Sequence, residues 1–150
     1  MKVKIKKVHP DAVIPRYAKA GDAGLDLTAT SKWYDENGNV CYGTGLAFEI
    51  PEGFVGMVFP RSSCTKKSIL LGNSVGIIDS GYRGEVSFKF KPSLVLTSGV
   101  NCNKVTPDDY EIGDRIGQII ILPYPQIEFE EADELSETER GVGGYGSSGK

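Results

Sequence analysis

The chain has 150 residues, of which 39% are hydrophobic and 25% are charged, and this composition is ordinary for one soluble globular domain. Its formal net charge of -3 argues against nonspecific binding of nucleic acid, which requires a basic surface. No apolar run approaches the roughly 18 residues that span a bilayer. We therefore expect neither a nucleic acid nor a membrane as a partner.

The elements predicted along the chain are mostly strands. Residues 2–8 alternate Val3 and Ile5 with lysines, which is the period-two pattern of a half-buried strand, and residues 85–91 alternate in the same way. Further strand-like runs occupy residues 46–50, 53–59, 93–99 and 116–124. Only residues 63–70 could form a short helix. Turn signals recur about every ten residues, at Asn37-Gly38, Pro51-Glu52-Gly53, Ser80-Gly81 and Ser98-Gly99. This spacing is typical of an all-β sandwich or barrel.

Two segments depart from this rhythm. Residues 101–110 are polar and are predicted to form a long hairpin loop. From Glu128 onward the chain is first acidic and then rich in Gly and Ser, with no pattern that could build a core. We therefore expect one β domain over residues 1–127, continued by an acidic linker and a mobile C-terminal arm over residues 128–150.

Cysteine and histidine usage narrows the possible chemistry. The three cysteines, Cys41, Cys64 and Cys102, form no C-x-x-C pair, so neither a disulfide framework nor a zinc site is indicated. A cytoplasmic location is the simplest setting for them. The single histidine, His9, has no partner pattern, so an active site would rest on carboxylates, hydroxyls, arginine and backbone groups.

Two short stretches combine turn residues with chemically useful side chains. Residues 76–85, GIIDSGYRGE, place Asp79 between an apolar pair and a glycine-rich turn, and taken alone they favour a plain turn. Residues 60–63, PRSS, lie between a predicted strand and the predicted helix. Their serines either cap that helix or, together with Arg61, bind an anion.

Five stretches occur in an order that indicates a protein family. They are AGDAGLDL (20–27), PRSS (60–63), GNSVGIIDSGYRGE (72–85), GDRIGQ (113–118) and RGVGGYGSSG (140–149). Each is a weak signal alone, but in this order, with strand-rich spacers, they resemble the five motifs of the trimeric dUTPases, the deoxyuridine triphosphate nucleotidohydrolases. The resemblance covers residues from about 20 to 149, nearly the whole chain.

The resemblance implies a fold, an assembly and a reaction. The fold of that family is a distorted jelly-roll-like β-barrel, in agreement with the predicted strands. Its members are homotrimers with shared active sites, each built from more than one subunit. They hydrolyse dUTP to dUMP and pyrophosphate with Mg²⁺, which keeps uracil out of DNA and supplies dUMP for dTMP synthesis.

The resemblance also assigns roles to residues of this chain. Asp79 matches the general base that deprotonates a water for attack on the α-phosphorus, and Tyr82 matches the aromatic residue under the deoxyribose. The hairpin around them is expected to form the nucleoside pocket. The residues matching those that read the uracil edge are Asn73, Gly76 and Ile78. The phosphate-binding segment corresponds to Arg61, Ser62 and Ser63.

The remaining roles concern the α-phosphate, the metal and the arm. Gln118 matches the amide near the α-phosphate and the attacking water. Asp26 matches a residue that reaches the metal through water, since Mg²⁺ keeps much of its water shell. The arm that closes over the phosphates corresponds to Arg140, Tyr145, Gly146, Ser147 and Ser148. Tyr145 stands where the family commonly has Phe, and stacking on uracil is expected to survive this change. Asp114 and Arg115 are interpreted as structural residues that form an interface ion pair.

Two alternatives to a dUTPase stay open at this point. The first is a dCTP deaminase of the same fold, which needs a glutamate in the hairpin pocket, where the nearest glutamate here is Glu85. The second is a non-catalytic trimer that binds nucleotide or a protein partner, for which the loop at residues 101–110 would be the place to look. Ammonia release from dCTP and deletion of that loop would test the two.

Overall fold

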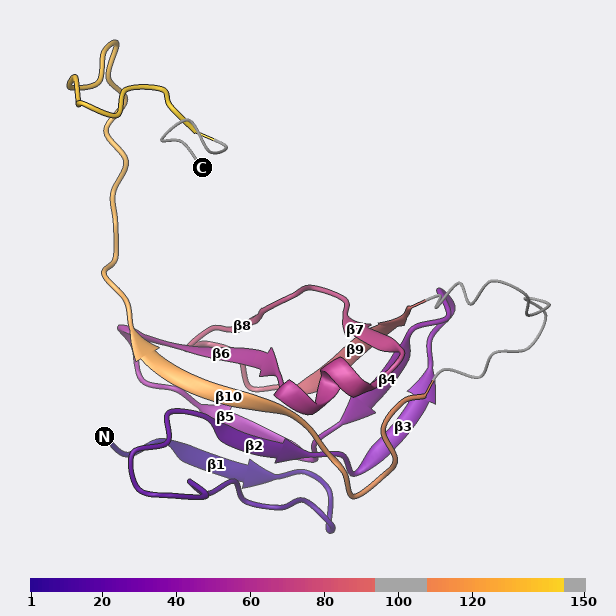
Figure 1. Ribbon diagram of the computed structural model, residues 1–150. Helices are drawn as coiled ribbons and strands as arrows, with labels where there is room; N and C mark the ends of the chain where they lie inside the picture. The colour runs from indigo at the N-terminus through magenta and orange to yellow at the C-terminus, as the bar shows by residue number, and fades with distance from the viewer. Residues whose placement is uncertain (94–107, 145–150) are drawn as a thin grey trace, which may run out of the picture.

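The computed structural model describes residues 1–93 and 108–144, and these residues form a barrel-like stack of antiparallel sheets (Figure 1). The strands are β1 (Lys4–Lys7), β2 (Leu25–Thr28), β3 (Ser31–Tyr34), β4 (Val40–Gly43), β5 (Leu46–Glu49), β6 (Phe54–Pro60), β7 (Ile69–Leu71), β8 (Gly76–Ile78), β9 (Ser87–Pro92) and β10 (Arg115–Pro123). One four-stranded sheet has the order β2-β10-β6-β8 and the other the order β3-β4-β9-β7, while β1 pairs with β5. The expected all-β, jelly-roll-like fold is confirmed.

The one helical element in the described part of the chain is η1 (Ser62–Lys66), which is a 3-10 helix. The prediction of a helix over residues 63–70 is therefore right in place but too long. Backbone bonds from Cys64 to Arg61 and from Lys67 to Cys64 close its turns, and 3-10 runs rarely extend further because their hydrogen bonds are poorly aligned. Among the described residues, no helix is long and apolar enough to cross a membrane.

The core lies between the sheets and follows the predicted alternation of β9. Val86, Phe88 and Phe90 are buried, and the residues between them are exposed. Phe90 packs edge-on against Tyr42 at 5.9 Å between ring centroids and lies 5.8 Å from the ring of Tyr110. Each such fully buried ring contributes about 1.5–3 kcal/mol by leaving water, so this aromatic cluster anchors the sheet β3-β4-β9-β7.

The expected hairpin over residues 76–85 is wrong in one respect. The stretch does turn, since the Tyr82 backbone N–H donates to the Asp79 carbonyl at 3.0 Å. However, β8 pairs with β6 in one sheet and β9 pairs with β4 and β7 in the other. The turn therefore connects the two sheets, because β8 and β9 do not pair with each other.

The strands β3 and β4 form a hairpin whose turn is organised by Asp35. Its carboxylate accepts hydrogen bonds from the backbone N–H of Asn37 and Asn39 at 3.0 Å each and from the Asn39 side chain at 2.9 and 3.1 Å. Gly38 has a φ of 76°, which a residue without Cβ adopts at no steric cost. The predicted Asn37-Gly38 turn is confirmed, although the two strands beside it were not predicted.

The chain beyond β10 leaves the barrel. Figure 1 shows residues after Pro123 running outward as an extended segment, and no helix or strand occurs in residues 124–144. Its apolar side chains are open to solvent: Ile127 is 69% exposed, Phe129 90% and Leu135 89%. Apolar groups so exposed in one copy of a chain are expected to find a surface on another.

The Asp35 turn makes a pH-dependent contribution to stability. Hydrogen bonds from Asn39 lower the pKa of Asp35 to about 2, against about 3.9 for an unfolded Asp. The folded pKa is depressed, so the stabilisation is present above about pH 4 and is lost as the pH falls toward 2. We expect the free energy of unfolding of Asp35→Asn to lie below wild type at about pH 6 and to converge on it near pH 2. Chemical denaturation across this range measures it, with the exposed neighbour Glu36→Gln as control; a constant gap would contradict the assignment.

Candidate active site

The register of the sheet β2-β10-β6-β8 sets the geometry of the candidate site. Gln118 of β10 lies opposite Asp26 of β2 on one side and opposite Phe59 of β6 on the other. Residues directly opposite one another share a face of the sheet, so these three side chains project together. All three are partly exposed, which places them on the outer face of the sheet.

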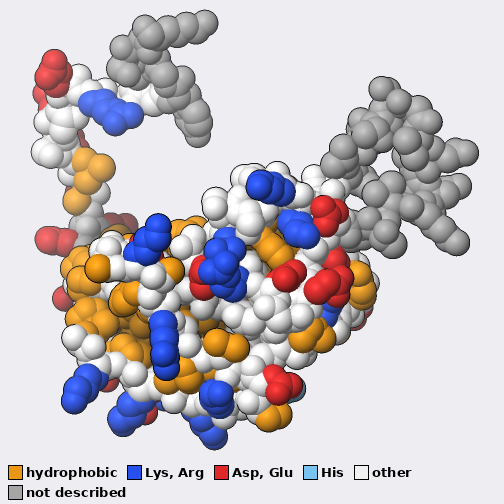
Figure 2. Space-filling view, turned by 60° about the horizontal axis from the view of Figure 1, so that its bottom comes forward, with side chains coloured by type: hydrophobic (Ala, Val, Ile, Leu, Met, Phe, Trp, Pro, Cys, Tyr) orange, Lys and Arg blue, Asp and Glu red, His pale blue; other side chains and the backbone are white. Residues whose placement is uncertain are grey.

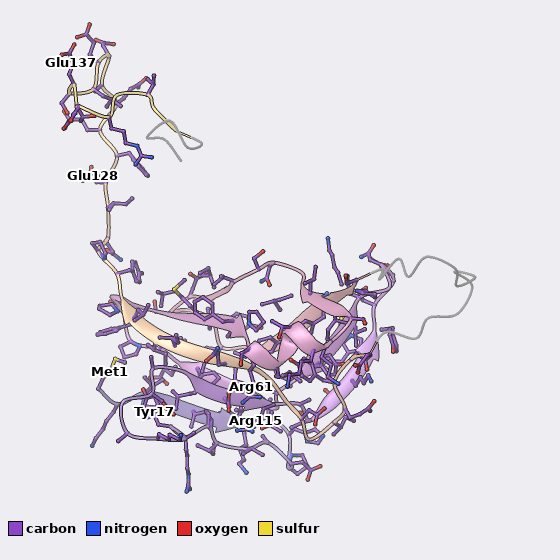
Figure 3. The ribbon with its side chains drawn as sticks, in the orientation of Figure 1. Met1, Tyr17, Arg61, Arg115, Glu128 and Glu137 are labelled. Carbon is purple, nitrogen blue, oxygen red and sulfur yellow. The ribbon has the colours of Figure 1, made fainter. Side chains whose placement is uncertain are left out.

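Asp26 is held by two arginines. One carboxylate oxygen accepts from Arg61 Nε at 2.7 Å and the other from Arg115 at 3.0 Å. Figure 3 shows Arg61 and Arg115 near β2 and β10. Charge-assisted bonds at these lengths are strong and directional, so the carboxylate fixes the position of both guanidinium groups. Within one chain, Arg115 bonds Asp26 and not its neighbour Asp114, which accepts the Glu111 backbone N–H at 2.9 Å. An interface pair between copies stays a prediction.

The PRSS segment presents hydroxyls that do not cap the helix. Arg61 occupies the N-cap position of η1, and no side-chain capping bond is formed there. Ser63 Oγ instead accepts a bond from Arg61 at 3.4 Å and lies 3.4 Å from the hydroxyl of Tyr110. The capping alternative is therefore disfavoured. Arg61, Ser62 and Ser63 form a turn with a fixed cation and two hydroxyl groups.

Gln118 is positioned by the strand end and by a glycine. Its amide nitrogen donates to the Pro60 carbonyl at 3.2 Å, so it sits beside the start of the PRSS turn. Its amide oxygen occupies the space where a side chain at Gly24 would lie. A Cβ at position 24 would displace this amide, which explains why the first motif has glycine there.

The expected base-reading residues line a cavity of about 380 Å³. Asn73, Gly76 and Ile78 form part of its wall, together with Val58 and Leu71. A Cβ at Gly76 would lie 2.5 Å from a Val58 methyl group and 3.2 Å from the Asn73 amide nitrogen, so glycine keeps this wall open. The opposite wall comes from the other sheet.

Residues not foreseen from the sequence complete the cavity. They are Asn39, Gly72, Ile77, Ser87, Lys89 and Lys91. Lys89 also contacts Asp35 at 3.4 Å. The alternation of β9 indicated that these lysines face outward, but only the packing of β9 near β8 places them at the cavity.

Asp79 and Tyr82 lie at the turn that leaves this cavity. Asp79 directly follows Ile78, and its side chain is exposed. The hydroxyl of Tyr82 donates to the Glu85 carbonyl at 3.0 Å, and its ring covers the bare backbone of Gly84. The turn therefore holds a flat ring and an exposed carboxylate next to the cavity mouth.

Glu85 has a structural role, since its carboxylate binds the backbone of another segment. One of its carboxylate oxygens accepts the Gly45 backbone N–H at 2.7 Å and lies over Gly43. It does not line the cavity that holds Asn73. A deaminase would need a carboxylate in that cavity, so this position argues against the deaminase alternative.

The two halves of the candidate site lie at opposite edges of one sheet. Asp26 is on the edge strand β2, and the cavity residues Gly76 and Ile78 are on the other edge strand, β8. The strands β10 and β6 lie between them. One chain therefore places the Asp26 carboxylate and the cavity three strands apart.

Arg140 stands apart from both halves. Its guanidinium donates to the Gly143 carbonyl at 3.0 Å, within its own turn. Figure 3 shows Glu128 and Glu137 on the segment that carries it away from the barrel. The expected arm residues Tyr145, Gly146, Ser147 and Ser148 lie outside the described residues.

The carboxylates of the described residues do not form a site that binds magnesium directly. The described residues contain no cluster of three or more His, Cys, Asp or Glu side chains that could hold a metal. Both oxygens of Asp26 are already bonded to arginine. The chain therefore does not fit a metal held directly by Asp26, whereas contact through water, as expected, is compatible with this geometry.

Burial shifts the pKa of two groups near the PRSS turn. It raises the pKa of Tyr110, a phenol that is protonated and able to donate at neutral pH even at its ordinary pKa of about 10. It also raises the pKa of the Cys64 thiol, which is buried. Tyr110 was predicted to lie in a polar loop, but its side chain is only 3% exposed.

Comparison with known proteins decides the family. A family model described as dUTPase matches residues 11–149. The chain belongs to the dUTPase family. A protein of Rhodococcus erythropolis named Deoxyuridine 5'-triphosphate nucleotidohydrolase is 40% identical over 151 residues, which cover 99% of this chain and 87% of that protein.

Solved structures of dUTPases share the fold. The dUTPase of Staphylococcus bacteriophage 80alpha, solved with dUPNHPP, matches with a TM-score of 0.81 and 26% identity over 99% of both chains. A dUTPase mutant from phage phi11 of S. aureus, described as revealing the coordination of a structural Mg(II) ion, matches with a TM-score of 0.72 and 21% identity, covering 91% of this chain and 100% of that chain. The second likeness shows the fold alone.

Proposed function

We propose that this dUTPase-family chain is a dUTP diphosphatase that hydrolyses dUTP to dUMP and pyrophosphate by attack of water on the α-phosphorus. The observation that carries the proposal is a cavity of about 380 Å³, lined by Asn73, Gly76 and Ile78, in which Ile78 directly precedes the exposed residue Asp79. Membership of the dUTPase family and the 40% identity to a named dUTP nucleotidohydrolase support it. Keeping uracil out of DNA and supplying dUMP for dTMP synthesis follow from this reaction.

Asp79 acts as the general base. It takes a proton from a water whose oxygen forms a bond to the α-phosphorus, and the bond from that phosphorus to the oxygen bridging to the β-phosphorus breaks. Pyrophosphate leaves with the bonding electrons. The side chain needs only to be fixed within hydrogen-bond reach of the water, and the Tyr82-to-Asp79 backbone bond holds its turn.

The cavity and Tyr82 select the substrate. Uracil enters between the two sheets, where the Asn73 amide pairs with its polar edge, and a base that leaves this amide unpaired is strongly disfavoured. The Tyr82 ring packs under the deoxyribose and leaves no room for a 2′-hydroxyl. Its hydroxyl is already bonded to Glu85, so the ring, and not the phenol oxygen, sets this selectivity.

Arg61, Ser62, Ser63 and Gln118 bind the phosphates. The Asp26 carboxylate holds Arg61 in place, and Gln118 lies beside the same turn through its bond to Pro60. A triphosphate offers many acceptor oxygens, which match the donors of a guanidinium, hydroxyls and an amide.

Mg²⁺ is the proposed cofactor, bound mainly by substrate phosphates. When bound, it neutralises charge on the departing pyrophosphate. Asp26 reaches it only through water, since its own oxygens serve Arg61 and Arg115. The three cysteines remain the basis for a cytoplasmic location.

The active unit is a homotrimer with shared active sites. The support is the placement of the Asp26 carboxylate and the cavity at opposite edges of one sheet, a separation that a neighbouring copy can bridge. In this assembly residues 1–127 form the barrel, and residues 128–150 form the linker and arm. Arg140, Tyr145, Gly146, Ser147 and Ser148 of that arm close over the nucleotide.

Surface chemistry supports contact between copies through the linker. Strand β1 pairs only with β5 among the described strands, and its lysines leave a basic open edge. Beside it an apolar cavity of about 310 Å³ is lined by Val3, Ile5 and Ile121, among others. Figure 2 shows apolar side chains gathered on one side of the barrel near basic ones. The acidic linker with Ile127 and Phe129 is complementary to such a surface.

The substrate assignment is tested by pyrophosphate release with Mg²⁺ from dUTP, dTTP, dCTP and UTP in parallel. We expect release from dUTP alone, because the cavity excludes the thymine methyl group and the cytosine amine, and Tyr82 excludes ribose. Release from UTP at a similar rate would contradict the role of Tyr82. Ammonia release from dCTP, or no reaction with any nucleotide, would contradict the proposed function.

The role of Asp79 is tested with Asp79→Asn. We expect kcat for dUTP to fall by roughly 10² to 10⁴, the usual share of a positioned base, with nucleotide affinity retained. Steady-state kinetics and binding of a non-hydrolysable analogue measure the two effects. Asp11→Asn, in an exposed loop, is the matched control and should keep wild-type kcat. A kcat of Asp79→Asn equal to that of the control would remove Asp79 from this role.

A further inference from the structure

The segment Asp108–Tyr110 contacts the chain at both ends of the 3-10 helix η1. At the far end, Lys67 pairs with Asp108 at 2.9 Å, and the Asp108 carbonyl accepts the Ser68 backbone N–H at 2.8 Å. At the near end, the hydroxyl of Tyr110 lies 3.4 Å from Ser63 Oγ. The position of the PRSS turn at the start of η1 is therefore coupled to a segment outside the five motifs.

Tyr110 is itself fixed by the core. The hydroxyl of Tyr42 donates to the Tyr110 carbonyl at 2.8 Å and accepts the Tyr110 backbone N–H at 3.0 Å. The Tyr110 ring packs between Tyr42 and Phe90, and the Lys67 ammonium lies 5.6 Å from its centroid. The backbone of Tyr110 is hydrogen-bonded and its ring is packed. These contacts fix the position of its phenol oxygen beside Ser63.

The bonding at Ser63 gives this placement a chemical consequence. Arg61 can only donate, and it donates to Ser63 Oγ. The Tyr110 hydroxyl can donate or accept, since a phenol keeps its proton at neutral pH. When Tyr110 also donates to Ser63, the serine oxygen has accepted twice and its own proton is left to point outward. An outward hydroxyl proton is what an anionic phosphate oxygen accepts.

We propose that Tyr110 is a positioning residue that directs the Ser63 hydroxyl toward the phosphates of the bound nucleotide. The inference rests on the proposed function, since it assigns Ser63 to phosphate binding. In this proposal Tyr110, which lies outside the motifs, contributes to recognition of the triphosphate. It does not contribute to recognition of the nucleoside.

The experiment compares Tyr110→Phe with Tyr34→Phe in the full-length protein. Both changes remove one phenol oxygen, and Tyr34 is exposed, with a 3.5 Å contact to Asp109. Affinities are measured for two probes, a non-hydrolysable imido analogue of dUTP and deoxyuridine. We expect Tyr110→Phe to weaken the analogue about fivefold, the worth of one hydrogen bond, and to leave deoxyuridine unchanged. Tyr34→Phe should change neither affinity.

A double-mutant cycle separates positioning from general damage. If Tyr110 acts through Ser63, then Ser63→Ala with Tyr110→Phe should bind the analogue no more weakly than Ser63→Ala alone. Additive losses, or equal losses for both probes, would overturn the proposal, as would an unchanged analogue affinity in Tyr110→Phe. Failure of the wild-type protein to bind either probe would instead overturn the proposed function, and the inference with it.

Discussion

The pairing of β10 with β6 is the constraint on which the rest of the structure depends. Seven consecutive residue pairs, from Gly117 with Pro60 to Pro123 with Phe54, join these two central strands. A slip of one residue would exchange the two faces of each strand and would place Gln118 in the core and Ile119 in solvent. The burial of Ile119 and Val58, which lie opposite one another, fixes the register against such a slip.

This register decides what one chain can and cannot do. The pairing of β10 with β2 then aligns Asp26 with Gln118, and Asp26 holds Arg61 and Arg115, so a cluster of donors forms on the outer face. The pairing of β6 with β8 places Val58 opposite Gly76 in the wall of the cavity. The phosphate-binding half and the nucleoside-binding half are therefore separate features of a single copy. A second copy of the chain is the simplest way to bring them together.

Local patterns in the sequence predicted the parts of this structure that local chemistry determines. The alternation in residues 85–91 gave the buried face of β9, and Asn37-Gly38 gave a turn, because side-chain period and glycine conformation are properties of short segments. The motif order indicated the family. By contrast, the partners of β8 and β9 could not be predicted from residues 76–85, since their pairing is set by β6 and β4.

The contacts that were not predicted have the same cause. Arg115 was interpreted as part of an interface ion pair, and its bond within one chain to Asp26, 89 positions away, was not predicted. Tyr110 ended a polar stretch and was taken for loop, yet Tyr42 draws it into the core. Contacts between distant segments depend on the sheet order, which no short window of sequence contains.

The most direct test of the account is complementation between two inactive variants. Asp79→Asn and Arg61→Ala would be refolded together in equal amounts and assayed for dUTP hydrolysis. If Asp79 and Arg61 of one site come from different copies, random mixing should restore about a quarter of the wild-type rate, since each position is intact with a probability of about one half. If both residues serve the same site from one chain, no mixed site is complete, and the rate should stay at that of the separate variants, which would contradict the shared site.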